Sequence, residues 1–141
     1  MRIVLDTNVY IAAALSGYGF SEDILKIAVR ANLAIIISEE ILLEIERKLI
    51  DKFNWSQADI DTFLFRIRKI TGVVSITQKL FVVTRDPDDN KILECAVSGE
   101  AELIVTLDQD LIKLKRFRGI GIVHPKTLGW VLPEYFKKRK T

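Results

Sequence analysis

The chain has 141 residues, of which 49% are hydrophobic and 28% charged, with a formal net charge of +2. This composition excludes a disordered chain, and the length suits one folded domain with a buried core. No apolar run approaches the ~20 residues that span a bilayer, and the single cysteine, Cys95, excludes an internal disulfide and a cysteine-based zinc site. We therefore expect a soluble, cytoplasmic protein that has no membrane partner.

The predicted elements alternate between short apolar runs and helical patterns. In chain order they are a strand at Arg2–Leu5, helices at Val9–Leu15 and from Ser21, a strand at Leu33–Ile37, helices from the N-cap Ser38 to Phe53 and from Ser56 to Gly72, a strand at Val73–Ile76 with an extension at Phe81–Val83, a helix at Asp89–Val97, a strand at Glu102–Thr106, a short helix at Asp110–Leu114, a strand at Ile120–Val123 and a helix from Pro125. Such alternation predicts an α/β fold with a mostly parallel central sheet and helices on both faces.

Charge is distributed unevenly along the chain. Residues 113–141 carry nine basic side chains and one acid, so residues 1–112 are net negative. We expect a folded domain over 1–136 and a basic tail over 137–141. This asymmetry is typical of chains that bind an anionic partner such as nucleic acid, but a solubilising tail explains it equally well.

Acidic residues follow the predicted strands at the places where α/β proteins bind ligands. Asp6 directly follows the first strand, Asp108 and Asp110 follow the run Leu103–Val105, and Asp89 opens a helix. Neighbouring strands lie about 4.8 Å apart, and two carboxylates about 5 Å apart repel by roughly 3 kcal/mol. Such a cluster takes up protons or binds a cation. Oxygen ligands alone suit Mg²⁺ or Mn²⁺ and disfavour zinc.

Each acid also has a purely structural explanation. Aspartates are common helix caps, which is the favoured interpretation for Asp86 and Asp88, and Asp108 with Asp110 is compatible with a turn. A further acid is expected from the helix that follows the second strand. There Glu44 and Glu46 border the apolar stripe on opposite shoulders, so periodicity does not choose between them, whereas Glu40 points away from the stripe.

Four segments in order and spacing carry a family resemblance: VLDTNV at 4–9, SEEILLEI at 38–45, RDPDDNK at 85–91 and AELIVTLDQDL at 101–111. With them the chain resembles the PIN-domain family of metal-dependent ribonucleases, and in particular the toxin components of bacterial and archaeal toxin–antitoxin pairs (VapC-like). The resemblance implies a PIN-like three-layer sandwich. It also implies hydrolysis of RNA with Mg²⁺ or Mn²⁺, an antitoxin partner and a homodimer.

Carried over by position, the catalytic and metal-binding acids of the family fall on Asp6, Glu44, Asp89 and Asp108, with Asp110 as an accessory metal ligand. The resemblance thereby selects Glu44 over Glu46. Asn8 and Thr106 match polar positions that support the acids by hydrogen bonding. Leu107 departs from the pattern, because this branch often has glycine there.

Basic residues near the acids are the candidates for holding an RNA backbone: Arg85, Lys91, Lys113, Lys115, Arg116 and Arg118. A solvated helix face explains each lysine taken singly. Two alternative functions stay open, a catalytically silent module that binds RNA or protein and a Mg²⁺-dependent phosphotransfer domain. The second fits less well, because a phosphatase of that type needs an aspartate where this chain has Asn8, and a receiver domain needs an acid pair where Asp6 stands alone.

Overall fold

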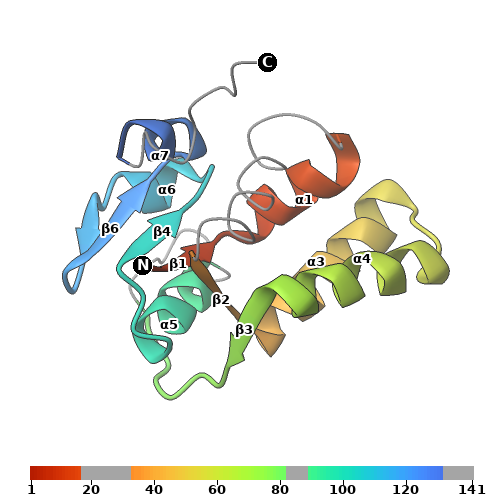
Figure 1. The fold of residues 1–141 in the computed structure, drawn as a ribbon, viewed down its shortest axis with the longest axis horizontal. Coiled ribbons are helices and arrows are strands. Elements are labelled where there is room, and N and C mark those ends of the chain that lie inside the picture. Colours follow the sequence, from red (N-terminus) through yellow and green to blue (C-terminus); the bar gives the residue numbers. More distant parts are fainter. Residues whose placement is uncertain (17–32, 82–88, 132–141) are drawn as a thin grey trace.

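The computed structural model describes residues 1–16, 33–81 and 89–131, the last three of them as backbone only. Within these ranges the chain forms one six-stranded sheet (Figure 1). From one edge to the other its strands are β3 (Thr71–Val74), β2 (Ala34–Ser38), β1 (Arg2–Leu5), β4 (Leu103–Val105), β6 (Ile120–Val123) and β5 (Arg116–Phe117). The neighbouring pairs are parallel, except that β5 runs antiparallel to β6.

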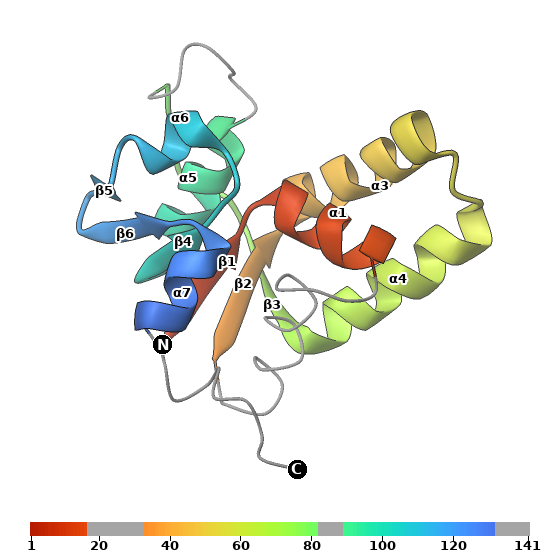
Figure 2. The same cartoon turned by 90° about the horizontal axis from the view of Figure 1, so that it is seen from above.

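Helices cover both faces of this sheet. They are α1 (Thr7–Ser16), α3 (Glu39–Phe53), α4 (Gln57–Ile70), α5 (Asn90–Ser98), α6 (Gln109–Ile112) and α7 (Pro125–Val131). Helix α5 lies on one side of the sheet, α1 and α7 lie on the other, and α3 with α4 extends beyond the β3 edge (Figures 1 and 2). The fold class predicted from the sequence, a mostly parallel sheet between helical layers, is confirmed.

The central strands are apolar on both faces because both faces are buried. Successive side chains of a strand point to opposite sides, and Ile3, Val4 and Leu5 of β1 are all fully buried. Burying each such side chain stabilises the fold by roughly 1.5–3 kcal/mol. Cys95 of α5 belongs to the same core, and burial raises the pKa of its thiol to about 12.

Capping residues determine where α3 and α4 begin. The Ser38 hydroxyl accepts a hydrogen bond from the Ile41 amide at 3.2 Å, and the Ser56 hydroxyl accepts one from the Asp59 amide at 3.2 Å.

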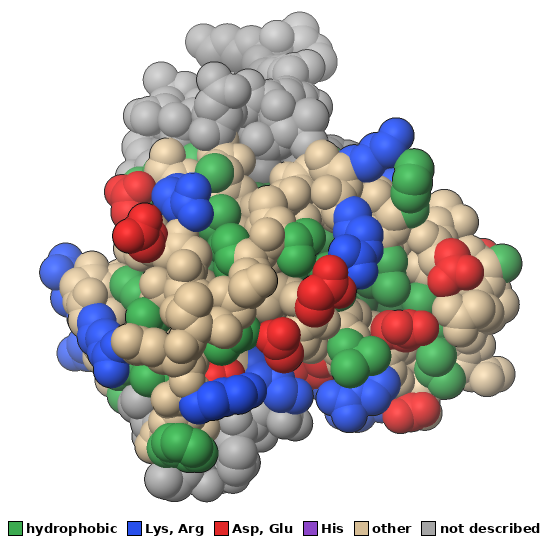
Figure 3. Space-filling view, turned by 90° about the horizontal axis from the view of Figure 1, so that it is seen from below, with side chains coloured by type: hydrophobic (Ala, Val, Ile, Leu, Met, Phe, Trp, Pro, Cys, Tyr) green, Lys and Arg blue, Asp and Glu red, His purple; other side chains and the backbone are tan. Residues whose placement is uncertain are grey.

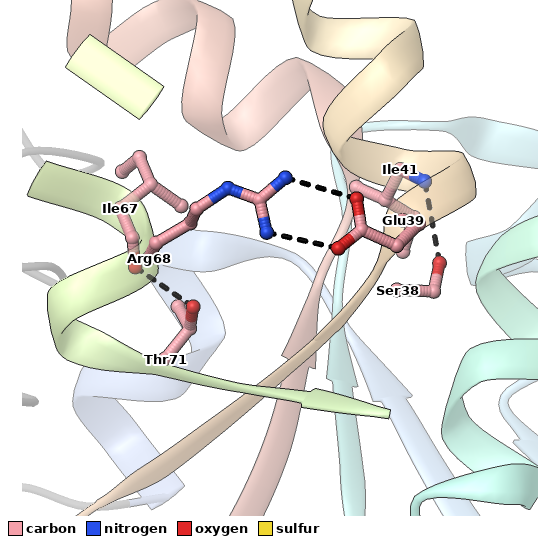
Figure 4. Close-up of polar contacts among 6 residues, drawn as sticks. All are labelled: Ser38, Glu39, Ile41, Ile67, Arg68 and Thr71. Carbon is pink, nitrogen blue, oxygen red and sulfur yellow. Dashed lines mark hydrogen bonds and ion pairs between the residues drawn. The ribbon is translucent and has the colours of Figure 1, made fainter. Parts of the chain in front are cut away.

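A bidentate pair joins the start of α3 to the end of α4, with both Arg68–Glu39 contacts at 2.9 Å (Figure 4). The two helices are therefore tied together at the end that borders the sheet.

The structure differs from the sequence predictions at β3, α6 and β5. The residue expected to stop α4, Gly72, lies inside β3, which starts at Thr71 because its residues pair with Ile35–Ser38 of β2. Helix α6 is shorter than predicted. Strand β5 was not predicted: it has two residues and depends on a tight turn in which Arg118 and Gly119 both adopt positive φ, as type I′ hairpin turns require.

Phe81, the first residue of the predicted strand extension Phe81–Val83, is not part of a strand. Other sequence predictions lie outside the described residues: the helix from Ser21, the rest of that extension over 82–83 and the basic tail over 137–141. Among the helices that are described, none combines the length and apolar character needed to cross a membrane.

Gly99 offers a test of how tightly α5 packs on the sheet. A Cβ added there would lie 2.5 Å from Ile36 Cγ2 in β2. We expect Gly99→Ala to lower the free energy of unfolding by about 2 kcal/mol, measured by urea denaturation, because overpacking forces α5 away from β2. Gly72→Ala is the control: the nearest atom there is Ile36 Cδ1 at 3.7 Å, so its effect should stay within about 1 kcal/mol. Equal stability of the two variants would contradict this packing.

Candidate functional site

Adjacent strands bring the first two polar positions together. β1 pairs with β4 so that Leu5 lies beside Val105, and the residues that follow, Asp6 and Thr106, leave the sheet at the same edge. The Asp6 amide continues the pairing by donating to the Val105 carbonyl at 2.9 Å. The chain runs from β1 to β2 on one side and places β4 on the other, which is the reversal point where open α/β sheets bind ligands.

Thr106 links two of the candidate acids. Its hydroxyl, which is completely buried, donates to Asp6 Oδ2 at 2.5 Å and accepts a hydrogen bond from the Asp108 amide at 3.0 Å. Because a hydroxyl has a single proton to donate, these two bonds fix its orientation. Thr106 thereby determines how the Asp6 carboxylate lies relative to the backbone that presents Asp108.

Three carboxylates converge beside this link. Oxygens of Asp89, Asp108 and Asp110 lie within 4.8 Å of one another. Asp108 is also the N-cap of α6, because its Oδ1 accepts hydrogen bonds from the Asp110 amide at 2.8 Å and the Leu111 amide at 3.2 Å. Asp108 therefore caps α6 and belongs to the carboxylate cluster at the same time, because the cap uses Oδ1 and Oδ2 takes no part in these bonds.

Glu44 and Asp6 form the second part of the site. Glu44 lies on α3, is only 8% exposed, and its charge acts on Asp6. One turn later on the same helix, the Lys48 ammonium lies 3.2 Å from Glu44 Oε1 and donates to Asn8 Oδ1, also at 3.2 Å. Glu46 instead accepts a hydrogen bond from Gln57. The tertiary structure thus separates the two glutamates that helical periodicity left equivalent.

Burial raises the pKa of Asp6 above its usual value of 3.8, and the negative charge of Glu44 adds to this effect. The hydrogen bond from Thr106 and the positive charge of Lys48 act in the opposite direction. The charged form of Asp6 is therefore disfavoured unless a cation is near it.

The donor set fits a hard divalent cation. Asp89, Asp108 and Asp110 offer only carboxylate oxygens, the ligands that Mg²⁺ and Mn²⁺ prefer, and water completes the coordination of such ions. The single histidine of the chain, His124, accepts a hydrogen bond from the Lys126 amide at the start of α7. These observations favour an oxygen-ligated metal over a zinc site.

The structure does not bring all of the basic candidates to the acidic edge. Lys91 lies in the first turn of α5, two residues after Asp89, and Lys113 and Lys115 are exposed after α6. β5 turns back, so that Phe117 pairs with Ile120 at the opposite end of β6. The Arg118 guanidinium there donates to Gln78 at 2.8 Å. Arg116 and Arg118 are exposed, in β5 and directly after it. Figure 3 shows Lys and Arg side chains along the left edge of the molecule.

Three of the sequence candidates, Arg85, Asp86 and Asp88, lie outside the described residues. One residue of the site was not singled out from the sequence. Lys48 lies four residues after Glu44, and this i,i+4 spacing of an acid and a base on a helix is the signal that identifies such a pair.

The matches to known proteins include a family model, a relative and a solved structure. The family model for the PIN domain matches residues 2–110. An uncharacterised protein of Methanocaldococcus jannaschii is 29% identical over 133 residues, which cover 89% of this chain and 84% of that protein. The crystal structure of VapBC2 from Rickettsia felis, bound to a DNA fragment from its promoter, contains a chain with the same fold, with a TM-score of 0.62, 19% identity, and coverage of 86% of this chain and 97% of that one.

The raised pKa of Asp6 predicts a pH-dependent stability difference. The folded protein keeps the Asp6 carboxyl protonated up to a higher pH than the unfolded chain does. Above the pKa that Asp6 has in the folded protein, its ionised carboxylate therefore lowers the free energy of unfolding. This loss of stability disappears below pH 3.8, where the carboxyl is protonated in both states. In EDTA at pH 7 we expect Asp6→Asn to raise the melting temperature by about 3 °C, with no gain at pH 3.5. Asp51→Asn, at an exposed position of α3, is the control and should change little at either pH. A lower melting temperature of Asp6→Asn at pH 7 would contradict the assignment.

Proposed function

This chain belongs to the PIN domain family, and we propose on that basis that it is a metal-dependent endoribonuclease, which hydrolyses phosphodiester bonds in RNA. The observation that carries the proposal is the convergence of Asp89, Asp108 and Asp110 at the sheet edge that also bears Asp6. A purely structural role would not require several carboxylates to face one another, because their mutual repulsion destabilises the fold.

In this proposal the carboxylates have two roles, metal binding and proton transfer. Asp89, Asp108 and Asp110 would hold Mg²⁺ or Mn²⁺, and Asp6 and Glu44 would complete the site. When bound, such an ion lowers the pKa of water and offsets negative charge on the phosphate oxygens. Asp6 lies at the same sheet edge, where the Thr106 hydroxyl holds its carboxylate, so it is placed to accept the proton of the attacking water.

Hydrolysis then needs few further groups from the protein. The water oxygen forms a bond to phosphorus, the bond from phosphorus to the leaving sugar oxygen breaks, and that oxygen takes a proton from solvent. Thr106 keeps Asp6 in place throughout through its hydrogen bond to Oδ2, and Lys48 keeps Glu44 in place through their ion pair. Both contacts are made before substrate arrives, so little reorganisation is needed during the reaction.

We propose further that the nuclease is the toxin of a toxin–antitoxin pair, with a protein antitoxin as partner. The support is the sequence resemblance together with the shared fold of a chain from the VapBC2 complex. A cluster of buried and half-buried acids also offers a site that a basic side chain of an antitoxin would neutralise. The homodimer and the cytoplasmic location expected from the sequence remain part of the proposal.

Two glutamates on one helix give the sharpest test of the catalytic site. We expect the protein to cleave single-stranded RNA in Mg²⁺ or Mn²⁺ and Glu44→Gln to cleave it about 100-fold more slowly, measured by gel kinetics. Glu46→Gln, two residues away and bonded to Gln57, should keep the original rate. EDTA should abolish cleavage. Binding of RNA without cleavage by the unaltered protein would support the silent module instead, and cleavage that survives both EDTA and Glu44→Gln would indicate a contaminating nuclease.

The toxin assignment is tested separately in growing cells. Controlled expression of the chain should arrest growth and produce RNA fragments with defined ends, because an unopposed nuclease degrades cellular RNA. Glu44→Gln expressed to the same level should leave growth and RNA unchanged, and Glu46→Gln should behave as the unaltered chain. If the active chain leaves growth and RNA untouched although it cleaves RNA in vitro, the toxin assignment falls and the nuclease assignment stands.

A further inference from the structure

Basic side chains follow one ridge of α3, which starts at Glu44 of the acidic site and runs away from it. Glu44, Lys48 and Lys52 follow one another at four-residue steps, so they lie on the same side of the helix in successive turns. From Glu44 to Lys52 the ridge is about 12 Å long, because each helical residue adds ~1.5 Å. Arg47 lies on the neighbouring ridge, next to Lys48 along the chain.

These residues line a hollow that begins at the site itself. Its volume is about 290 Å³, and its lining consists of Glu44, Arg47, Lys48, Asp51 and Lys52. Three cations thus face two acids, one of which is Glu44 of the candidate site. Arg47 and Lys52 are exposed, and no ion pair joins either of them to another residue in the described ranges.

Lys48 connects the hollow with the catalytic residues. Its ammonium lies 3.2 Å from both Glu44 Oε1 and Asn8 Oδ1, and 27% of its side chain is exposed. Its positive charge therefore acts in two directions, toward the buried carboxylates and toward solvent. A phosphate in the hollow would meet Lys48 before it met Glu44.

An RNA backbone needs such a path because the acids repel it. Asp6, Glu44, Asp89, Asp108 and Asp110 all present negative charge at one edge of the sheet, and cations near that edge must offset the repulsion. Arg118 is poorly placed for this role, since it lies at the opposite end of β6 and is bonded to Gln78. The α3 cations start one turn away from Glu44.

We propose that the RNA backbone reaches the acidic site across α3, with Arg47, Lys48 and Lys52 contacting the phosphates that flank the one to be cleaved. The proposal rests on the nuclease function proposed above and adds a direction of approach to it. It assigns phosphate binding to three residues that the sequence motifs do not single out. Contacts of this kind fix the register of the strand and carry no base preference.

Two double variants with equal charge loss test the path. Arg47→Gln/Lys52→Gln removes the outer cations of α3, and Arg116→Gln/Arg118→Gln removes two from β5; all four side chains are exposed. Binding of a fluorescent single-stranded RNA is measured by anisotropy at several salt concentrations, in an Asp6→Asn background that prevents cleavage. Thermal unfolding confirms that each variant is folded. Lys48 is kept in both variants because it contacts Glu44.

The salt dependence reports the number of phosphates contacted. Each neutralised phosphate of a single strand contributes about −0.7 to the slope of log K against log salt, so the α3 variant should make the slope shallower by about 1.4. Its affinity should fall roughly tenfold at low salt, whereas the β5 variant keeps the original slope. In the active background the α3 variant should raise KM and leave kcat nearly unchanged.

Other outcomes overturn the path. If both double variants lost the same RNA affinity, affinity would follow total charge. If the α3 variant bound RNA as tightly as the unaltered protein, the strand would approach the site from elsewhere. In both cases cleavage by the unaltered protein leaves the nuclease function standing. If the unaltered protein neither binds nor cleaves RNA, the proposed function fails and the path fails with it.

Discussion

The parallel pairing of β1 with β4 places Leu5 beside Val105, and the rest of the site depends on that register. A slip of one residue would reverse the face to which every β1 side chain points and would separate Asp6 from Thr106. The register is secured by side chains that are completely buried on both faces of β1 and by the bond from the Asp6 amide to the Val105 carbonyl. Apolar packing in the core therefore positions the polar groups at the edge.

Stability and function oppose one another at this edge. Asp6 is buried beside Glu44, an arrangement that costs folding free energy when both are ionised. Thr106 and Lys48 recover part of that cost by a hydrogen bond and a nearby positive charge. The cation site proposed above would account for this cost, because carboxylates that are placed to bind an ion repel one another when the ion is absent.

Much of the fold followed from local pattern. The apolar runs that became β1, β2, β4 and β6 were recognised because buried parallel strands are apolar on both faces. Ser38 and Ser56 were recognised as helix starts because serine caps are a local signal. β5 was missed, since a two-residue strand with Arg118 and Gly119 in its turn has no distinctive composition, and β3 was displaced because its pairing with β2 decides its boundary.

The sequence by itself determined that Asp6 and Asp108 follow predicted strands and that Asp89 opens a predicted helix, and from this it predicted an acidic edge of an α/β sheet. The family resemblance already grouped Asp110 with these acids, but only the tertiary structure gave the 4.8 Å within which oxygens of Asp89, Asp108 and Asp110 lie, and only it placed Lys48 of α3 against Asn8 at the start of α1. The reason is physical: periodicity records which face each helix or strand buries, whereas contacts between elements far apart in the chain depend on strand order and register. Those are properties of the whole sheet, and no local stretch of sequence contains them.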